Sequence, residues 1–189
     1  MVEAPSHKSP KVPPRRVAIV VAAAVIVAVL VWVLASSGSG KKNGGTTASA
    51  VPTAATQVQL EQLAAKVKHP IYWAGAKAGY TYELTQTSDG NIYVRYLPPG
   101  VKVGDKRADF LTVGTYPETD PMRSLTSALK RKGTQRFSVP QGGTAVQDSA
   151  HPTSVYLTYP NSSFLLEIFE PSPAQARAVA RSGAIQPLG

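Results

Sequence analysis

The chain contains no cysteine. This absence excludes disulfides, thiolate metal sites, cysteine nucleophiles and an anchor made by lipid modification of a cysteine. A domain exported without disulfides must be held together by its hydrophobic core, and about 130 residues are enough for such a core.

Motifs of metal and catalytic sites are missing as well. The three histidines are His7, His69 and His151, and their spacing does not match a paired metal-ligand motif such as H-x-x-x-H. The sequence has no G-x-S-x-G nucleophile turn and no phosphate-binding glycine loop. Two carboxylates, Asp105 and Asp109, share a loop with three basic residues, which we expect to neutralise them. We therefore expect no metal or cofactor, and the sequence favours binding over catalysis.

One long hydrophobic run stands near the N-terminus. Residues 17–35 read VAIVVAAAVIVAVLVWVLA, without a charge, a proline or a glycine. A helix of this length spans roughly 28 Å at about 1.5 Å per residue, close to the roughly 30 Å of a bilayer core. Because lipid offers no hydrogen bonds to the backbone, a helix is the state we expect. The run predicts a transmembrane helix that contacts the lipid bilayer.

The flanking charges predict the orientation of this helix. The tail formed by residues 1–16 carries four basic residues, and Arg15 and Arg16 adjoin the run directly. The positive-inside rule places this tail in the cytoplasm and the C-terminal part outside the cell membrane. The alternative is a cleaved signal peptide, but the run is longer than the roughly 7–15 apolar residues typical of one. Both interpretations export the same domain.

Residues 36–56 are rich in Gly, Ser, Thr and Ala and show no apolar period. This composition predicts a flexible linker with a typical reach of about 25 Å. The extracytoplasmic domain then comprises residues 57–189.

The pattern within this domain predicts three helices and two clear hairpins. The helices are expected at 57–69, 121–132 and 173–181, with Thr56, Asp120 and Ser172 as their N-caps. The first hairpin joins 80–87 to 92–97, and a three-residue loop gives it one apolar face and one charge-paired face. The second joins 154–159 to 164–170 through a four-residue loop. The expected pairs are Tyr82–Tyr96, Leu84–Val94, Gln86–Ile92 and Glu83–Arg95 in the first hairpin, and Val155–Ile168, Leu157–Leu166, Tyr159–Phe164 and Tyr156–Glu167 in the second.

Hairpins with separate helices indicate an α+β fold. We expect an antiparallel sheet built from hairpins, with two or three helices on one face, preceded by the transmembrane helix.

Two groups of residues are candidates for an interaction surface. Tyr72, Trp73 and Tyr93, with Arg95, are aromatic and basic side chains that can bind glycans or partner chains if exposed, although core packing is the ordinary role of strand tyrosines. Lys130, Arg131 and Lys132, together with Arg123 and Arg136, form the densest basic cluster. They suit an anionic partner, but cations also stabilise a helix C-terminus by about 0.3–1 kcal/mol each.

Three stretches resemble a known group of proteins. They are HPIYWAG at 69–75, YELTQTSDGNIYVRYLPPGVKVGD at 82–105 and LTVGTYP at 111–117. The chain is similar there to small actinobacterial membrane-anchored proteins of unknown function. The resemblance implies a bacterial cell-envelope setting and assigns no functional residue.

Three functions remain open from the sequence. The first is a non-catalytic envelope module that binds a protein partner or an anionic wall polymer. The second is a membrane-tethered hydrolase with a site near the 98–109 loop. The third is an accessory subunit that contacts partners through its transmembrane helix, where Ala24 and Ala28 permit close packing. Nucleic acid is not an expected partner of an exported domain.

Overall fold

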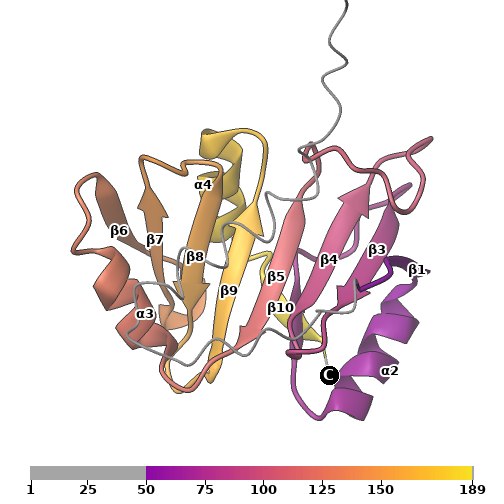
Figure 1. Ribbon diagram of the computed structural model, residues 1–189, viewed down its shortest axis with the longest axis horizontal. Helices are drawn as coiled ribbons and strands as arrows, with labels where there is room; N and C mark the ends of the chain where they lie inside the picture. The colour runs from indigo at the N-terminus through magenta and orange to yellow at the C-terminus, as the bar shows by residue number, and fades with distance from the viewer. Residues whose placement is uncertain (1–49, 189) are drawn as a thin grey trace, which may run out of the picture.

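The computed structural model describes residues 50–188 (Figure 1). The strands are β1 (Thr53–Ala55), β2 (Ile71–Trp73), β3 (Thr81–Gln86), β4 (Ile92–Leu97), β5 (Thr112–Pro117), β6 (Thr134–Ser138), β7 (Thr144–Asp148), β8 (Ser154–Thr158), β9 (Phe164–Phe169) and β10 (Gln186–Leu188). The helices are α2 (Gln57–Val67), α3 (Pro121–Ala128) and α4 (Pro173–Arg181), and a short 3-10 turn spans Pro140–Gly142.

A single antiparallel sheet forms the centre of the domain. Its eight strands follow the order β1-β3-β4-β5-β9-β8-β7-β6, and β10 pairs with β2 in a separate two-stranded sheet. Two meanders, one on each side, meet where β5 pairs with β9. The α+β class and the antiparallel sheet expected from the sequence are confirmed.

The main core lies on one face of the sheet. Helices α2 and α4 and the β2–β10 pair cover this face, and α4 and β10 are seen behind the sheet in Figure 1. Alternate strand residues such as Val94, Val113 and Ile168 point into this layer and are fully buried. Burial of each such side chain contributes about 1.5–3 kcal/mol, so this layer carries much of the domain's stability.

Two of the three helices, α2 and α4, share one face, within the expected two or three, but the third, α3, covers the other face. Helix α3 packs against β7, β8 and β9, and Leu125 joins Tyr116, Tyr156 and Leu165 in a second core. These strand residues alternate with the members of the main core, so they point to the opposite face. The physical reason is that the central strands are apolar on both sides, and each side needs cover.

The helix N-termini follow the predicted caps. Thr56 and Gln59 form a capping box on α2, Asp120 accepts a hydrogen bond from the Arg123 amide at 3.0 Å, and Ser172 caps α4. Helix α3 ends at Ala128, four residues before its predicted end at Lys132. Successive turns follow instead, since the Lys130 amide donates to the Ser127 carbonyl at 3.2 Å and the Arg131 amide to that of Ala128 at 3.1 Å.

Both hairpins have the predicted registers. In the first, Tyr82 pairs with Tyr96 and Glu83 with Arg95, as the three-residue loop requires. In the second, Leu157 pairs with Leu166. Facing apolar pairs fix these registers, because a slip by one residue would turn every apolar side chain to the wrong face.

The structure changes one boundary of the expected linker. Residues 53–55, inside the expected linker 36–56, form β1 and pair with β3, so the ordered domain begins before Gln57. Residues 53–55 show no apolar period from which a strand could be predicted, but their backbone forms the edge strand of the sheet.

The expected tail 1–16, the apolar run 17–35 and residues 36–49 lie outside the described residues. Within residues 50–188, none of the helices has the length and apolar character needed to cross a membrane.

Candidate functional site

The aromatic residues singled out from the sequence lie in the core. Tyr72, Trp73 and Tyr93 are only 8%, 5% and 6% exposed. Tyr72 stacks on Tyr159 with ring centroids 5.8 Å apart, and Trp73 meets Tyr82 edge-on at 5.6 Å. These rings therefore do not form the exposed surface that the sequence suggested, because Tyr72 and Trp73 pack in the main core and Tyr93 packs edge-on against Tyr116 in the second core, with ring centroids 5.7 Å apart.

Arg95 has a structural role. Its guanidinium forms an ion pair with Glu83 at 2.5 Å, and the two side chains are 11% and 2% exposed. Arg95 also donates to the backbone carbonyls of Asp105 and Arg107, both at 2.9 Å. Glu83 in turn accepts the Gly104 amide at 2.5 Å. The pair thus fastens the 98–109 loop to the sheet and is not a free cation on the surface.

The 98–109 loop holds one of its carboxylates, Asp105, in an ion pair. Asp105 and Arg107 form a two-point contact, with Nη2 2.9 Å from Oδ2 and Nε 3.0 Å from Oδ1. Hydrogen bonds from the Arg107 side chain lower the pKa of Asp105 to about 2. A general acid needs a raised pKa, so Asp105 is not suited to that role.

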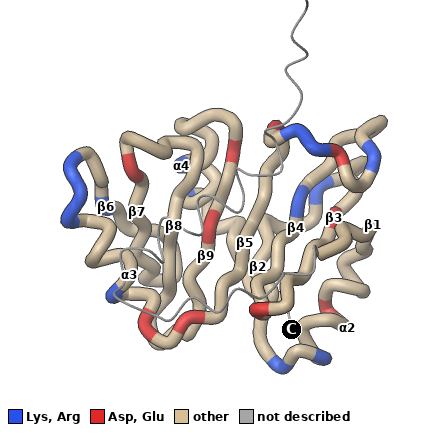
Figure 2. The backbone as a smooth tube through the Cα atoms, in the orientation of Figure 1, with Lys and Arg blue, Asp and Glu red and all other residues tan. Residues whose placement is uncertain are grey.

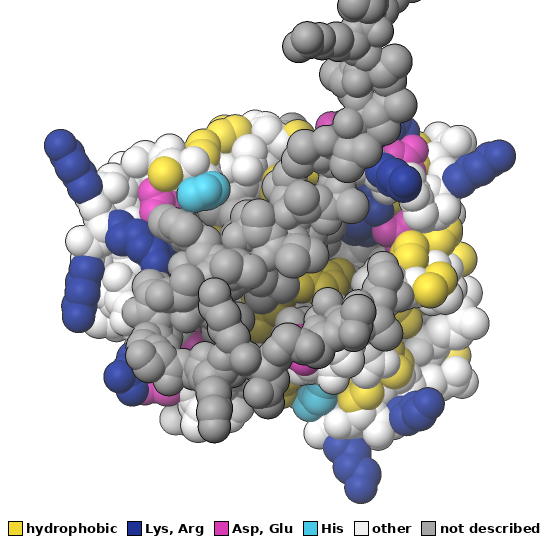
Figure 3. Space-filling view, in the orientation of Figure 1, with side chains coloured by type: hydrophobic (Ala, Val, Ile, Leu, Met, Phe, Trp, Pro, Cys, Tyr) yellow, Lys and Arg dark blue, Asp and Glu magenta, His cyan; other side chains and the backbone are white. Residues whose placement is uncertain are grey.

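The remaining candidates lie at one end of the sheet. Lys130, Arg131 and Lys132 form the connection from α3 to β6, with Lys130 and Lys132 exposed, and Arg136 lies in β6 itself. Blue segments mark this end at the left of Figure 2, and Lys and Arg side chains project from it in Figure 3.

Helix α4 adds two further cations. The guanidinium of Arg177 lies 5.1 Å from the ring centre of Phe137 in β6, and that of Arg181 lies 4.8 Å from it. Arg177 is held by hydrogen bonds at 2.8 Å to the side-chain oxygens of Gln135 and Gln147. Sequence reasoning missed these arginines, because their i, i+4 spacing marks one helix face but does not indicate which strand that face meets.

We call this group the basic edge: Lys130, Arg131, Lys132, Arg136, Arg177 and Arg181. No Asp or Glu occurs between Leu129 and Gln147 or within α4. Asp148, at the end of β7, is buried, with 8% of its surface exposed. Cations concentrated in this way create a positive potential that attracts anions.

A second polar group lies on the face of the sheet that α3 covers. Glu167 in β9 is 8% exposed and accepts hydrogen bonds from Tyr116, from Ser154 Oγ at 2.7 Å and from Tyr156 Oη at 3.1 Å. Burial raises the pKa of Tyr116 and of Tyr156 well above the ordinary value, so both hydroxyls remain donors. The sequence places Tyr156 opposite Glu167 but gives no sign of Tyr116. With three donors, this carboxylate is a satisfied structural group.

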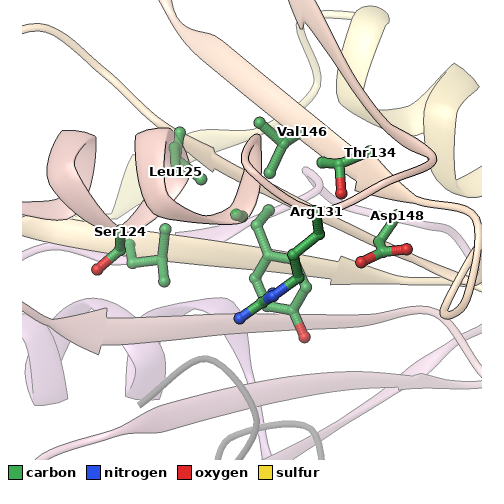
Figure 4. A pocket seen from close by; sticks show the side chains of 9 residues that line it. Ser124, Leu125, Arg131, Thr134, Val146 and Asp148 are labelled. Atoms are coloured by element: carbon green, nitrogen blue, oxygen red, sulfur yellow. The ribbon is translucent and has the colours of Figure 1, made fainter. Parts of the chain in front are cut away.

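A small cavity lies between this group and α3. Its volume is about 10 Å³, and Figure 4 shows Leu125, Val146 and Arg131 among the side chains around it. Tyr156 lines it too. This space is about that of one water molecule and is too small for an organic ligand.

Among residues 50–188, no group of three or more His, Asp or Glu side chains is placed to hold a metal ion. Of the residues that the sequence singled out, the basic edge contains Lys130, Arg131 and Lys132, with Arg136 of the same predicted cluster. Comparisons of the chain with protein-family models, with curated proteins and with solved structures find no match.

Proposed function

We propose that this protein is a non-catalytic binding module of the cell envelope that binds an anionic partner at its basic edge. The observation that carries the proposal is the gathering of six cations around β6. Four of them lie in residues 130–136 and two lie in α4, and neither segment contains an acidic residue. The resemblance to bacterial membrane-anchored proteins is consistent with this setting.

Stabilisation of a helix C-terminus, the alternative role of the basic run, does not explain the positions of these cations in the structure. Lys130, Arg131 and Lys132 follow the end of α3 at Ala128, so none of them lies in its last turn. The helix-dipole effect falls off within that turn. Arg177 and Arg181 belong to another helix and lie beside the same strand. Stabilisation of one helix therefore does not explain why the cations meet.

The proposal includes the anchor. The apolar run 17–35 would hold the domain at the outer face of the cell membrane, with its N-terminus in the cytoplasm. A linker with a reach of about 25 Å would keep the basic edge near that surface. Partners are then limited to anionic envelope components, such as an acidic protein segment or a wall polymer.

The test uses the full chain in nanodiscs of zwitterionic lipid. The probe is fluorescent poly-L-glutamate, and its binding is followed by anisotropy at several salt concentrations. Changing Lys130→Glu together with Lys132→Glu is expected to weaken binding about tenfold, because two attractive contacts of about 0.2–1 kcal/mol each become repulsive. Binding to the unchanged protein should also weaken as salt rises.

Lys102→Glu with Lys106→Glu is the matched control. Both lysines are exposed, lie in the 98–109 loop at the far end of the sheet and give the same change in net charge. This variant is expected to bind poly-L-glutamate nearly as well as the unchanged protein. If the two double variants lose binding equally, net charge alone explains the attraction and the basic edge is not a site.

A further inference from the structure

The pairing of β6 with β7 determines which of its backbone groups face outward. The Ser149 amide donates to the Gly133 carbonyl at 3.2 Å and the Val139 amide to the Gly143 carbonyl at 3.0 Å. In an antiparallel pair, hydrogen-bonded residues alternate with residues that turn their N–H and C=O groups away. Residues 135 and 137 therefore bond to β7, while Arg136 and Ser138 direct their amides and carbonyls to the outer side.

These outward groups lie at an open edge. Of the strands in residues 50–188, none lies beyond β6 in the sheet. The Thr134 amide is already used, since it donates to the Arg131 carbonyl at 3.3 Å. Arg136 and Ser138 are exposed, and no described strand pairs with their outer backbone groups. The edge thus offers two donors and two acceptors in the spacing of a strand.

Cations lie on both sides of this edge. The Arg136 side chain points to the face that carries α3, and its Nη2 lies 3.4 Å from Thr144 Oγ1. Arg177 and Arg181 lie on the other face, against Phe137. A strand added beside β6 would point successive side chains to the two faces in turn. Acidic side chains on either face would then meet a cation.

We propose that β6 binds an extended acidic peptide segment of a partner protein by strand addition. The proposal rests on the proposed function and names its partner class and its geometry. Main-chain hydrogen bonds to Arg136 and Ser138 supply affinity, and opposite charge supplies selectivity. A second copy of this chain is disfavoured as the occupant, because pairing β6 with β6 would place like charges side by side, which is how basic edge strands resist self-association.

The decisive substitution is Ser138→Pro. It removes one outward N–H without changing charge, and proline is tolerated on an edge strand where the N–H faces away from the sheet. The matched control is Ser138→Ala, which keeps the N–H. The probe is a fluorescent octapeptide of alternating Glu and Thr, measured by anisotropy with the full-length protein in zwitterionic nanodiscs. We expect Ser138→Pro to weaken binding about three- to tenfold, the contribution of a backbone hydrogen bond, and Ser138→Ala to leave it unchanged.

Hydrogen exchange of the unchanged protein provides a measurement that needs no variant. The amides of Arg136 and Ser138 should exchange quickly in the free protein and become protected when the peptide binds, while the Gln135 amide is protected in both states. If peptide binding leaves the Arg136 and Ser138 amides unprotected, strand addition is wrong even if Ser138→Pro disturbs folding.

The outcomes separate this inference from the proposed function. If Lys130→Glu with Lys132→Glu weakens peptide binding and Ser138→Pro does not, the basic edge binds anions without strand addition. If neither variant weakens binding, both proposals fail. If the unchanged protein forms a dimer that Ser138→Pro abolishes, a second copy occupies the edge and the acidic-peptide proposal is overturned.

Discussion

Replacing Arg95 with alanine is expected to destabilise the domain strongly. Glu83, which is 2% exposed beside Arg95, would keep the Gly104 amide as its remaining described partner. Removing one partner of a buried ion pair costs about 3–5 kcal/mol, because the other charge stays buried without compensation. Arg95 also binds two loop carbonyls, so the 98–109 loop should loosen. At about 4 °C per kcal/mol, the melting temperature should fall by roughly 12–20 °C.

The assay is thermal and urea unfolding of the full-length protein in detergent, followed by circular dichroism. Arg107→Ala is the matched control, because it removes an ion pair in which the arginine side chain is 57% exposed and Asp105 is 22% exposed. Exposed pairs contribute about 0–1 kcal/mol, so this variant should unfold almost as the unchanged protein does. A loss below about 1 kcal/mol for Arg95→Ala, or equal losses for both variants, would refute the role given to the Glu83–Arg95 pair.

Two further predictions concern the buried tyrosines. Tyr116→Phe removes a hydroxyl that donates to buried Glu167 and should lower the free energy of unfolding by about 1–3 kcal/mol in urea unfolding; an unchanged value would mean that this hydrogen bond contributes nothing. Burial raises the pKa of Tyr93 and of Tyr159 to about 12, above about 10 in the unfolded chain. Their contribution to stability is complete below pH 10 and is lost as pH rises through 12, where each should have lost about 2 kcal/mol. Absorbance at the tyrosinate band and urea midpoints between pH 8 and pH 12 measure this, and midpoints that stay constant would contradict it.

The features of the fold that can be predicted from the sequence are those that depend on residues close together in the chain. The registers of both hairpins follow from matching apolar faces, and the Glu83–Arg95 pair follows from the first of them. The helix starts at Thr56, Asp120 and Ser172 follow from capping chemistry.

The features that sequence reasoning missed join distant parts of the chain. The β2–β10 pair brings together Tyr72 and Pro187, and neither three-residue strand is long enough to show a period. The face chosen by α3 was also missed, because an amphipathic helix does not reveal which side of a sheet it covers. The basic edge was predicted only as its local part, Lys130 to Lys132 with Arg136. Arg177 and Arg181 join it through packing across the fold.

Site-specific photo-crosslinking in living cells of the source tests strand addition at the basic edge most directly. A photoreactive amino acid replaces Ser138 at the outer edge of β6 or, as a control, Val58 on α2, which is 58% exposed. We predict an adduct with an acidic protein at position 138, none at position 58, and loss of the adduct when Lys130 and Lys132 are changed to Glu. Equal crosslinking at both positions, or crosslinking at position 138 that survives the charge reversal, would contradict this prediction.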